Sequence, residues 1–109
     1  MSKSEKLQGS MDLLVLKVLS SRPGIHGYAI TAAIREISEE VLRVEDGSLY
    51  PALHRMEEAG WIRAKWIAKA AGGRRRVYEL TAVGKKQLAA EESRWQSVTF
   101  AVNRVLRMV

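Results

Sequence analysis

Two β-prone runs, 61–67 and 74–80, form a candidate hairpin with helical patterns on both sides. Between them, Ala70-Ala71-Gly72-Gly73 is typical of a turn, because glycine adopts the backbone conformations that tight turns require. Side chains alternate strictly along both predicted strands. Ile62, Ala64 and Trp66 share one side of the first strand, and Arg76, Tyr78 and Leu80 share one side of the second. The 109 residues therefore predict a mainly α fold with a small β-hairpin, of the α+β class, in one compact domain.

Apolar periodicity predicts two helices near the start of the chain. The first begins at Ser10 as its N-cap and is stopped by Arg-Pro-Gly at 22–24. It is apolar nearly all round, which predicts burial against more than one neighbour. The second begins near Gly27 and runs into the acidic residues 38–40.

A third helix follows the capping residues 46–48 and ends at Gly60. Pro51 fits only in its first turn, where a missing N–H was unpaired anyway. The residues 41–44 before it are β-prone and predict one short strand.

A last helix is capped by Thr81 and reaches nearly to Val109. It carries an apolar stripe made of Leu88, Trp95, Val98, Val102, Val105, Leu106 and Val109. A stripe on a helix of about 25 residues is longer than a small domain needs, which indicates pairing with another chain.

Positive charge is concentrated in one segment. The chain has 18 Lys and Arg against 12 Asp and Glu, a net charge of +6. Six of those cations and no acid lie within residues 63–76, and the remaining 12 cations and 12 acids cancel. A solvated face is the simpler interpretation of a charge run, but it does not explain why acids are absent only here. We therefore predict contact with a polyanion.

Several classes of function find no support in the composition. The chain has no cysteine and two histidines, which argues against a disulfide scaffold, thiol catalysis and a metal site. Its eight glycines form neither a P-loop nor a dinucleotide fingerprint, and no nucleophile motif is present. We expect no enzymatic activity and no cofactor. Lys17 interrupts the apolar run 13–19, so we expect no signal peptide and no membrane span, and a cytoplasmic protein.

Three short helices, a hairpin rich in Arg and Lys, and a trailing helix describe a winged helix-turn-helix. In such a domain the third helix enters the major groove and the hairpin, or wing, meets neighbouring phosphates or the minor groove. Ser48 and Tyr50 are suited to phosphate, and His54 and Arg55 to base edges. The full set of predicted DNA-binding residues is Tyr28, Ser48, Tyr50, Pro51, His54, Arg55, Lys65, Arg74, Arg75 and Arg76.

Three motifs resemble the PadR family of bacterial transcriptional regulators. The run 47–62, GSLYPALHRMEEAGWI, is similar to the family's signature in the third helix. The run 72–81, GGRRRVYELT, followed by Gly84, resembles a second, and His26-Gly27-Tyr28 a third. Trp61 stands where the family usually has Leu, and Val77 where an aromatic or polar residue is common.

The resemblance implies a homodimeric repressor whose last helix packs against the partner. The domain organisation expected is a flexible N-terminal arm at 1–9, a winged-helix DNA-binding domain at 10–81 and a dimerisation helix at 82–109. The dimer contacts expected are Leu88, Trp95, Val98, Val102 and Leu106. The single C-terminal helix resembles the short subfamily, in which a Trp of this helix stacks on planar ligands at the dimer interface. The corresponding effector-binding residues are Trp95, Met11, Leu14 and Val15.

Ordinary structural roles are the alternatives for several of these residues. Trp95 and the apolar residues of the first helix also fit a dimer core, and His54 also fits a solvent-exposed helix position. Tyr50 can pack under the wing and Tyr28 can be a core residue. A different class of function is a basic nucleic-acid-binding or partner-docking module without effector response, for which duplex RNA is the discriminating ligand.

Overall fold

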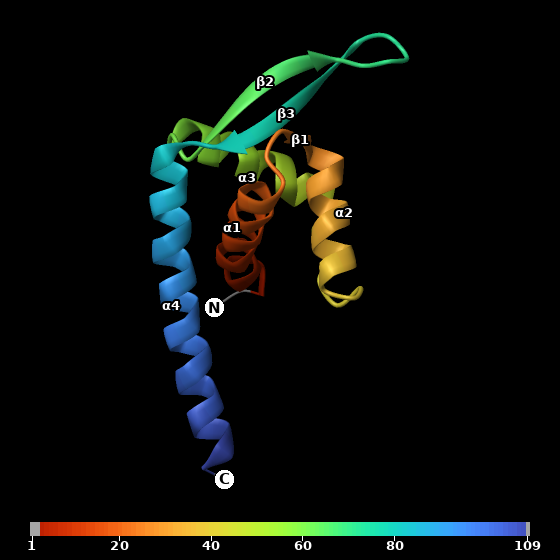
Figure 1. Ribbon diagram of the computed structural model, residues 1–109. Helices are drawn as coiled ribbons and strands as arrows, with labels where there is room; N and C mark the ends of the chain where they lie inside the picture. The colour runs from red at the N-terminus through yellow and green to blue at the C-terminus, as the bar shows by residue number, and fades with distance from the viewer. Residues whose placement is uncertain (1–2, 109) are drawn as a thin grey trace.

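The computed structural model describes residues 3–108. Within them lie four helices and a three-stranded antiparallel sheet, which confirms the predicted α+β class (Figure 1). In chain order the elements are α1 (Lys3–Ser21), β1 (Ile25–His26), α2 (Gly27–Ile37), α3 (Asp46–Glu58), β2 (Ile62–Ala68), β3 (Arg74–Leu80) and α4 (Ala82–Arg107).

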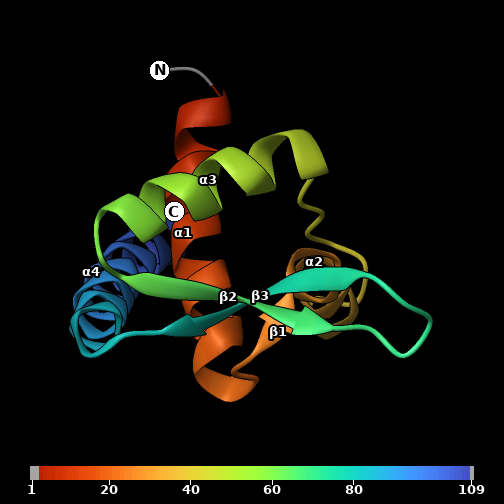
Figure 2. The same ribbon diagram turned by 90° about the horizontal axis from the view of Figure 1, so that it is seen from above.

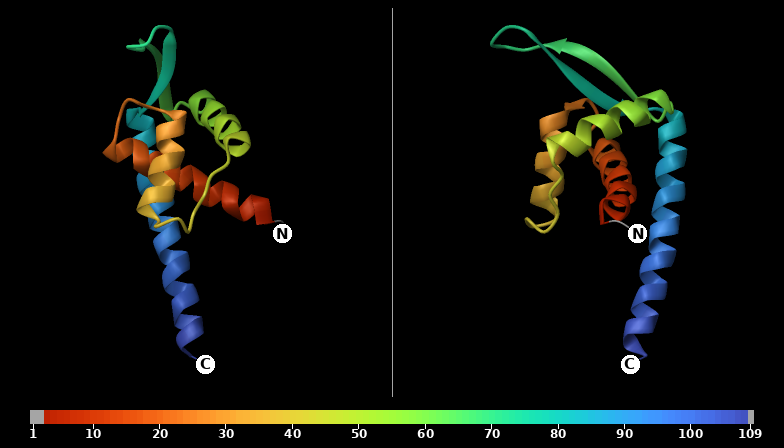
Figure 3. Two further views of the ribbon diagram at one scale, coloured as in Figure 1. Left: turned by 90° about the vertical axis from the view of Figure 1, so that its right-hand side faces the viewer. Right: turned by 180° about the vertical axis from the view of Figure 1, so that it is seen from behind.

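The four helices are arranged beneath the sheet, and two elements project from the body. The wing formed by β2 and β3 reaches beyond α2, and the C-terminal half of α4 extends past every other element (Figures 1 and 3). Seen from above, α3 runs alongside the wing and crosses over α1 (Figure 2). The molecule is therefore elongated, with extents of 58 × 29 × 25 Å.

The hairpin has the predicted register. Cα partners include Ile62 with Leu80, Ala64 with Tyr78 and Trp66 with Arg76. The sheet has the order β1-β3-β2, because Ile25 pairs with Tyr78 on the other edge of β3.

The prediction of a short strand at 41–44 is wrong. These residues form the connection between α2 and α3, and the short strand is β1 instead. The turn after α1 returns the chain to β3, where the Gly24 N–H donates to the Tyr78 carbonyl at 2.9 Å. Strand formation depends on a hydrogen-bonding neighbour, so β-prone side chains without one do not form a strand.

The core is centred on α1, as its nearly continuous apolar surface predicts. Val15, Leu16 and Leu19 of α1 are among the largest side chains that are completely buried. They pack with side chains of α2 and α3, including Ile30, Leu49, Leu53 and Met56. The buried residues of α3 share one face of the helix, as their helical spacing requires.

Two helices begin earlier in the chain than expected. α1 starts at Lys3, so the segment 3–9 expected as an arm lies within it, and residues 1 and 2 lie outside the described part. Glu, Lys, Leu and Gln within 3–9 are good helix formers, which explains the longer helix. α3 starts at Asp46, so Pro51 lies in its second turn and not its first. Gly47, whose carbonyl Pro51 cannot bond, is an exposed residue, which lowers the cost of this position.

The end of α3, the start of the wing and the start of α4 meet at one junction. As predicted, Thr81 caps α4, since its Oγ1 accepts from the Gly84 N–H at 3.0 Å. The same hydroxyl donates to the Gly60 carbonyl at 2.5 Å, and the Thr81 N–H donates to the Trp61 carbonyl at 3.0 Å. A Cβ on Gly84 would overlap the Trp61 carbonyl oxygen, so glycine alone permits this close approach.

We expect Gly84→Ala to lower the free energy of unfolding by about 1–3 kcal/mol, because α4 must shift away from the Trp61 carbonyl. Urea denaturation followed by circular dichroism measures the loss. Gly47→Ala is the matched control, since a Cβ there meets nothing within 4 Å and the position is helical. Equal stability of Gly84→Ala and the wild type would contradict the proposed close contact.

Candidate nucleic-acid interface

One face of α3 is exposed to solvent. At about 100° per residue, Gly47, Tyr50, Pro51, His54 and Glu58 share one side of the helix, and all five are exposed. His54 Nε2 lies 3.0 Å from Glu58 Oε1. Of the residues predicted to face DNA, Tyr50, Pro51 and His54 therefore occupy the outward surface of this helix.

Tyr50 also sets the contact between α2 and α3. A Cβ built on Gly27, the first residue of α2, would lie 2.6 Å from the Tyr50 hydroxyl. The glycine in the His26-Gly27-Tyr28 motif thus lets the phenol ring pack directly on the helix start. Half of the Tyr50 side chain remains exposed, and Tyr28, more exposed still, stacks on the His26 ring with centroids 6.3 Å apart.

Arg55 is directed toward α1 and not toward the outward face. Its Nη2 donates to both carboxylate oxygens of Asp12, at 2.6 and 2.8 Å. Asp12 is mostly buried while Arg55 is about half exposed. The side chain expected to reach base edges is thus held against α1, and it reaches a base only by releasing Asp12.

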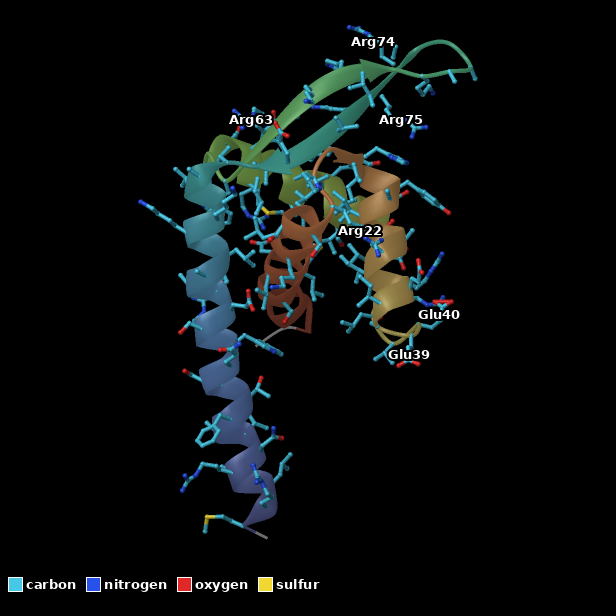
Figure 4. The ribbon with its side chains drawn as sticks, in the orientation of Figure 1. Arg22, Glu39, Glu40, Arg63, Arg74 and Arg75 are labelled. Atoms are coloured by element: carbon cyan, nitrogen blue, oxygen red, sulfur yellow. The ribbon has the colours of Figure 1, made fainter. Side chains whose placement is uncertain are left out.

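Alternation divides the wing cations between its two surfaces. Arg74 and Arg75 leave the wing on opposite sides (Figure 4). Arg76 is on the Arg74 side, where its Nη2 donates to Glu57 Oε2 of α3 at 2.7 Å. Lys65 is paired with Val77 in the ladder and shares the side of Arg75. The four wing residues predicted to bind DNA are therefore all exposed but do not form one surface.

The cationic run is less charged in space than in sequence. Arg63 Nε lies 3.0 Å from Glu79 Oε1, and Arg76 is paired with Glu57, so carboxylates from outside the run neutralise two of its six cations. Lys65, Lys69, Arg74 and Arg75 have no carboxylate partner within the described part of the chain. The free positive charge is thus concentrated toward the wing tip.

His26 lies beside the wing. Its Nδ1 is 3.3 Å from Arg75 Nη1. A guanidinium only donates, so Nδ1 must be the unprotonated nitrogen for this contact to be a hydrogen bond. Partial burial, and to a smaller degree the Arg75 charge, lower the pKa of His26 below its ordinary value of 6.5.

A mostly apolar cleft of about 540 Å³ separates α1, the 42–45 connection, α3 and α4. It brings together three of the four predicted effector residues, Met11, Leu14 and Trp95. Val15 does not line it, because its side chain is completely buried in the core. Three predicted DNA-binding residues of α3, Ser48, Pro51 and Arg55, form another wall of the same cleft.

The predicted dimer stripe on α4 is divided between the core and the surface. Leu88 is buried in the core of its own chain. Trp95, Val98, Val102 and Leu106 are exposed by 50, 48, 49 and 68%. From Ser93 to Met108 every residue is exposed, so this half of α4 has no cover from its own chain within the described residues.

A comparison with models of protein families shows which family this chain resembles. Residues 15–90 match the model of the transcriptional regulator PadR-like family. The chain belongs to this family. The predicted resemblance is confirmed, and the protein is a DNA-binding transcriptional regulator of a family of regulators, not of enzymes.

Solved structures of similar proteins agree with the fold of this PadR-like regulator. It is similar to a transcriptional regulator from Clostridium thermocellum, with 25% identity and a TM-score of 0.83, covering 95% of this chain and 97% of the other. It is also similar to a PadR-like transcriptional regulator from Bacillus cereus, with 27% identity and a TM-score of 0.79, covering 94% of this chain and 96% of the other. A protein of Lysinibacillus sphaericus is 26% identical over 98 residues, which are 90% of this chain and 89% of that protein. Among residues 3–108, none of the helices of this PadR-like regulator has both the length and the apolarity of a membrane span.

Sequence reasoning missed several residues of these sites. Leu42, Arg43, Val44 and Glu45 line the cleft, but the β-prone pattern at 41–44 indicated a strand and not a cleft wall. Asp12 and Glu57 are distant in sequence from the arginines they bind. The predicted hairpin register did indicate one further contact, because it placed Trp66 directly opposite Arg76 on the neighbouring strand.

We expect His26 to titrate below pH 6.5 in the folded protein, and Arg75→Ala to raise its pKa toward 6.5. Because the unfolded chain binds this proton first, the stability that neutral His26 contributes is present above pH 6.5. It is lost as the pH falls from 6.5 through the lower pKa of the folded state. Proton NMR of the imidazole measures the titration, with His54→Gln assigning the two histidine signals. A His26 pKa at or above 6.5, or one unchanged by Arg75→Ala, would contradict the contact.

Proposed function

We propose that this PadR-like regulator is a cytoplasmic homodimeric repressor that binds a pseudo-palindromic operator and is released by a planar apolar effector. The observation that carries the DNA-binding part is the juxtaposition of α3 and the wing. The outward face of α3 carries Tyr50, Pro51 and His54, and the Arg76–Glu57 pair joins the wing to the same helix. Helix and wing thus lie next to each other, in an arrangement that suits a groove and its flanking phosphates.

In this proposal α3 enters a major groove of DNA. His54 lies at the centre of the outward face, where base edges would be, and Tyr50 and Ser48 lie closer to the phosphates. The free cations Lys65, Arg74 and Arg75 supply the phosphate contacts that are independent of sequence.

The exposed half of α4 supports pairing with a second copy. Its apolar stripe, Trp95, Val98, Val102, Val105 and Leu106, covers one side of the helix over about three turns. An exposed apolar stripe of this length is typical of a helix that packs against another helix. A two-fold dimer would place two α3 helices on half-sites about one or two helical turns apart.

We expect a specific complex with DNA from upstream of the regulator's own gene, measured by electrophoretic mobility shift at moderate salt. Neutralising Lys65, Arg74 and Arg75 together should weaken binding to all duplexes similarly and reduce the salt slope by about 1 for each phosphate that is no longer neutralised. His54→Ala should instead change the preference among sequences, by about 1–3 kcal/mol at the base that it reads. The proposal fails if no sequence-specific complex forms. Comparable affinity for duplex RNA would favour a general nucleic-acid-binding module.

The cleft beside Trp95 supports the effector part of the proposal. Its volume of about 540 Å³ suits a small molecule, and its surface is mostly apolar. Because Ser48, Pro51 and Arg55 of α3 form one wall, a ligand there would contact the DNA-reading helix itself. A ligand that displaces the Arg55 guanidinium would also disturb its bonds to Asp12, which hold α3 against α1. Such a contact gives the ligand a different affinity for the two positions of α3, which release requires.

We expect planar aromatic compounds such as pyrenemethanol to quench the tryptophan fluorescence of the wild type and to weaken its complex with the operator. Trp95→Ala should remove most of the quenching. Phe100→Ala is the control, because Phe100 is an exposed aromatic residue of α4 that does not line the cleft. Quenching that survives Trp95→Ala would come from Trp61 or Trp66 and would contradict an effector site at this position.

A further inference from the structure

Trp66 of β2 lies between two arginines on the exposed part of the wing. The guanidinium carbons of Arg74 and Arg76 lie 5.2 and 5.6 Å from the centre of its ring system. All three residues are on one side of the hairpin, because Trp66 pairs with Arg76 and the next residue on that side of β2, Ala68, pairs with Arg74. Both distances are within the range of a cation–π interaction.

Trp66 is not part of the hydrophobic core, so packing in the core does not explain a tryptophan at this position. β2 is buried at Ile62 and is exposed from Lys65 onward, so this part of the strand is in contact with solvent. The Trp66 side chain is 54% exposed. Its ring lies close to two guanidinium groups, and its electron-rich face attracts each of them.

The two arginines are placed at different points between α3 and the wing tip. Arg76 is fixed to α3, since its Nη2 donates to Glu57. Arg74 is the first residue of β3 and adjoins the tip turn at 69–73. Glu57, Arg76, Trp66 and Arg74 therefore form a continuous series of contacts from the DNA-reading helix to the tip.

On duplex DNA a phosphate backbone runs between the groove that a recognition helix occupies and the adjacent groove that a wing reaches. The Trp66 cluster lies between α3 and the wing tip, so in the proposed docking it would face this backbone. Arg has five N–H donors, so Arg76 can bind a phosphate while it keeps its bond to Glu57. A guanidinium stacked on an aromatic ring also loses less conformational freedom when it binds.

We propose that Trp66 is a positioning residue for DNA binding, whose indole ring holds Arg74 and Arg76 toward phosphates of the backbone between the two grooves. This inference rests on the proposed docking of the wing. Trp66 is itself uncharged. Its role is to increase the affinity for any DNA duplex and not to select a sequence.

The test compares Trp66→Leu, Trp66→Phe and Ile67→Ala in DNA titrations followed by fluorescence anisotropy at several salt concentrations. Trp66→Leu should weaken binding to operator and to unrelated duplex alike, by roughly three- to tenfold, and should reduce the salt slope by about 1. Trp66→Phe should restore part of the affinity, because its ring still attracts cations. Ile67→Ala should bind like the wild type, since Ile67 is a similarly exposed neighbour on the opposite side of the strand.

A double-mutant cycle with Arg74→Ala separates positioning from direct contact. If Trp66 acts through Arg74, Trp66→Leu should cost much less affinity in the Arg74→Ala background than in the wild type. Wild-type affinity and salt slope in Trp66→Leu, or full additivity with both Arg74→Ala and Arg76→Ala in separate cycles, would overturn the positioning role. If Arg74→Ala and Arg76→Ala leave DNA affinity unchanged, the docking of the wing itself fails, which is a different result. Equal melting temperatures of Trp66→Leu and the wild type exclude loss of fold as the cause.

Discussion

The crossing of α4 over the turn between α3 and the wing is the contact on which the positions of the other elements depend. Gly84 lies so close to the Trp61 carbonyl that no Cβ fits between them. Thr81 adds hydrogen bonds to Gly60, Trp61 and Gly84 at the same place. Three elements with separate roles, the DNA-reading helix, the wing and the dimer helix, thereby leave one junction in defined directions. A shift at this junction would change the angle between α3 and the wing and the direction of α4 together.

α3 distributes four roles around its circumference. Leu49, Leu53 and Met56 are buried in the core, while the opposite side is free in solvent. On one flank Glu57 binds the wing through Arg76, and on the other Arg55 binds α1 through Asp12 and borders the cleft. The helix is thus held from both flanks while its outward surface stays free, which suits a helix that must read a groove without losing its orientation. The flank toward the cleft is also the one through which a ligand can act on it.

The positive charge of this protein is distributed differently along the sequence and over the folded structure. All of the net charge of +6 belongs to residues 63–76 when residues are counted along the chain. In the folded protein Glu57 and Glu79 neutralise two of those cations, and strand alternation separates Arg74 and Arg75 onto opposite sides of the wing. The cations left free are nearer the tip, and two guanidinium groups gather around one indole ring.

Local patterns were sufficient for the presence of the four helices, though not for the starts of α1 and α3, and for the hairpin and its register. Period-2 and period-3.6 spacings reflect backbone geometry that each segment carries with it. They also placed Thr81 as a cap and located the DNA-reading helix and the wing. They failed at 41–44 and at β1, because a strand requires a neighbour that the segment does not contain. The contact between Arg55 and Asp12, the burial of Leu88 and Val15, and the cleft that joins Trp95 to α3 depended on packing between distant segments. No periodicity along the chain records which side chains meet across two helices, so the folded arrangement alone determined whether a residue with suitable chemistry faces a partner, a ligand or the core.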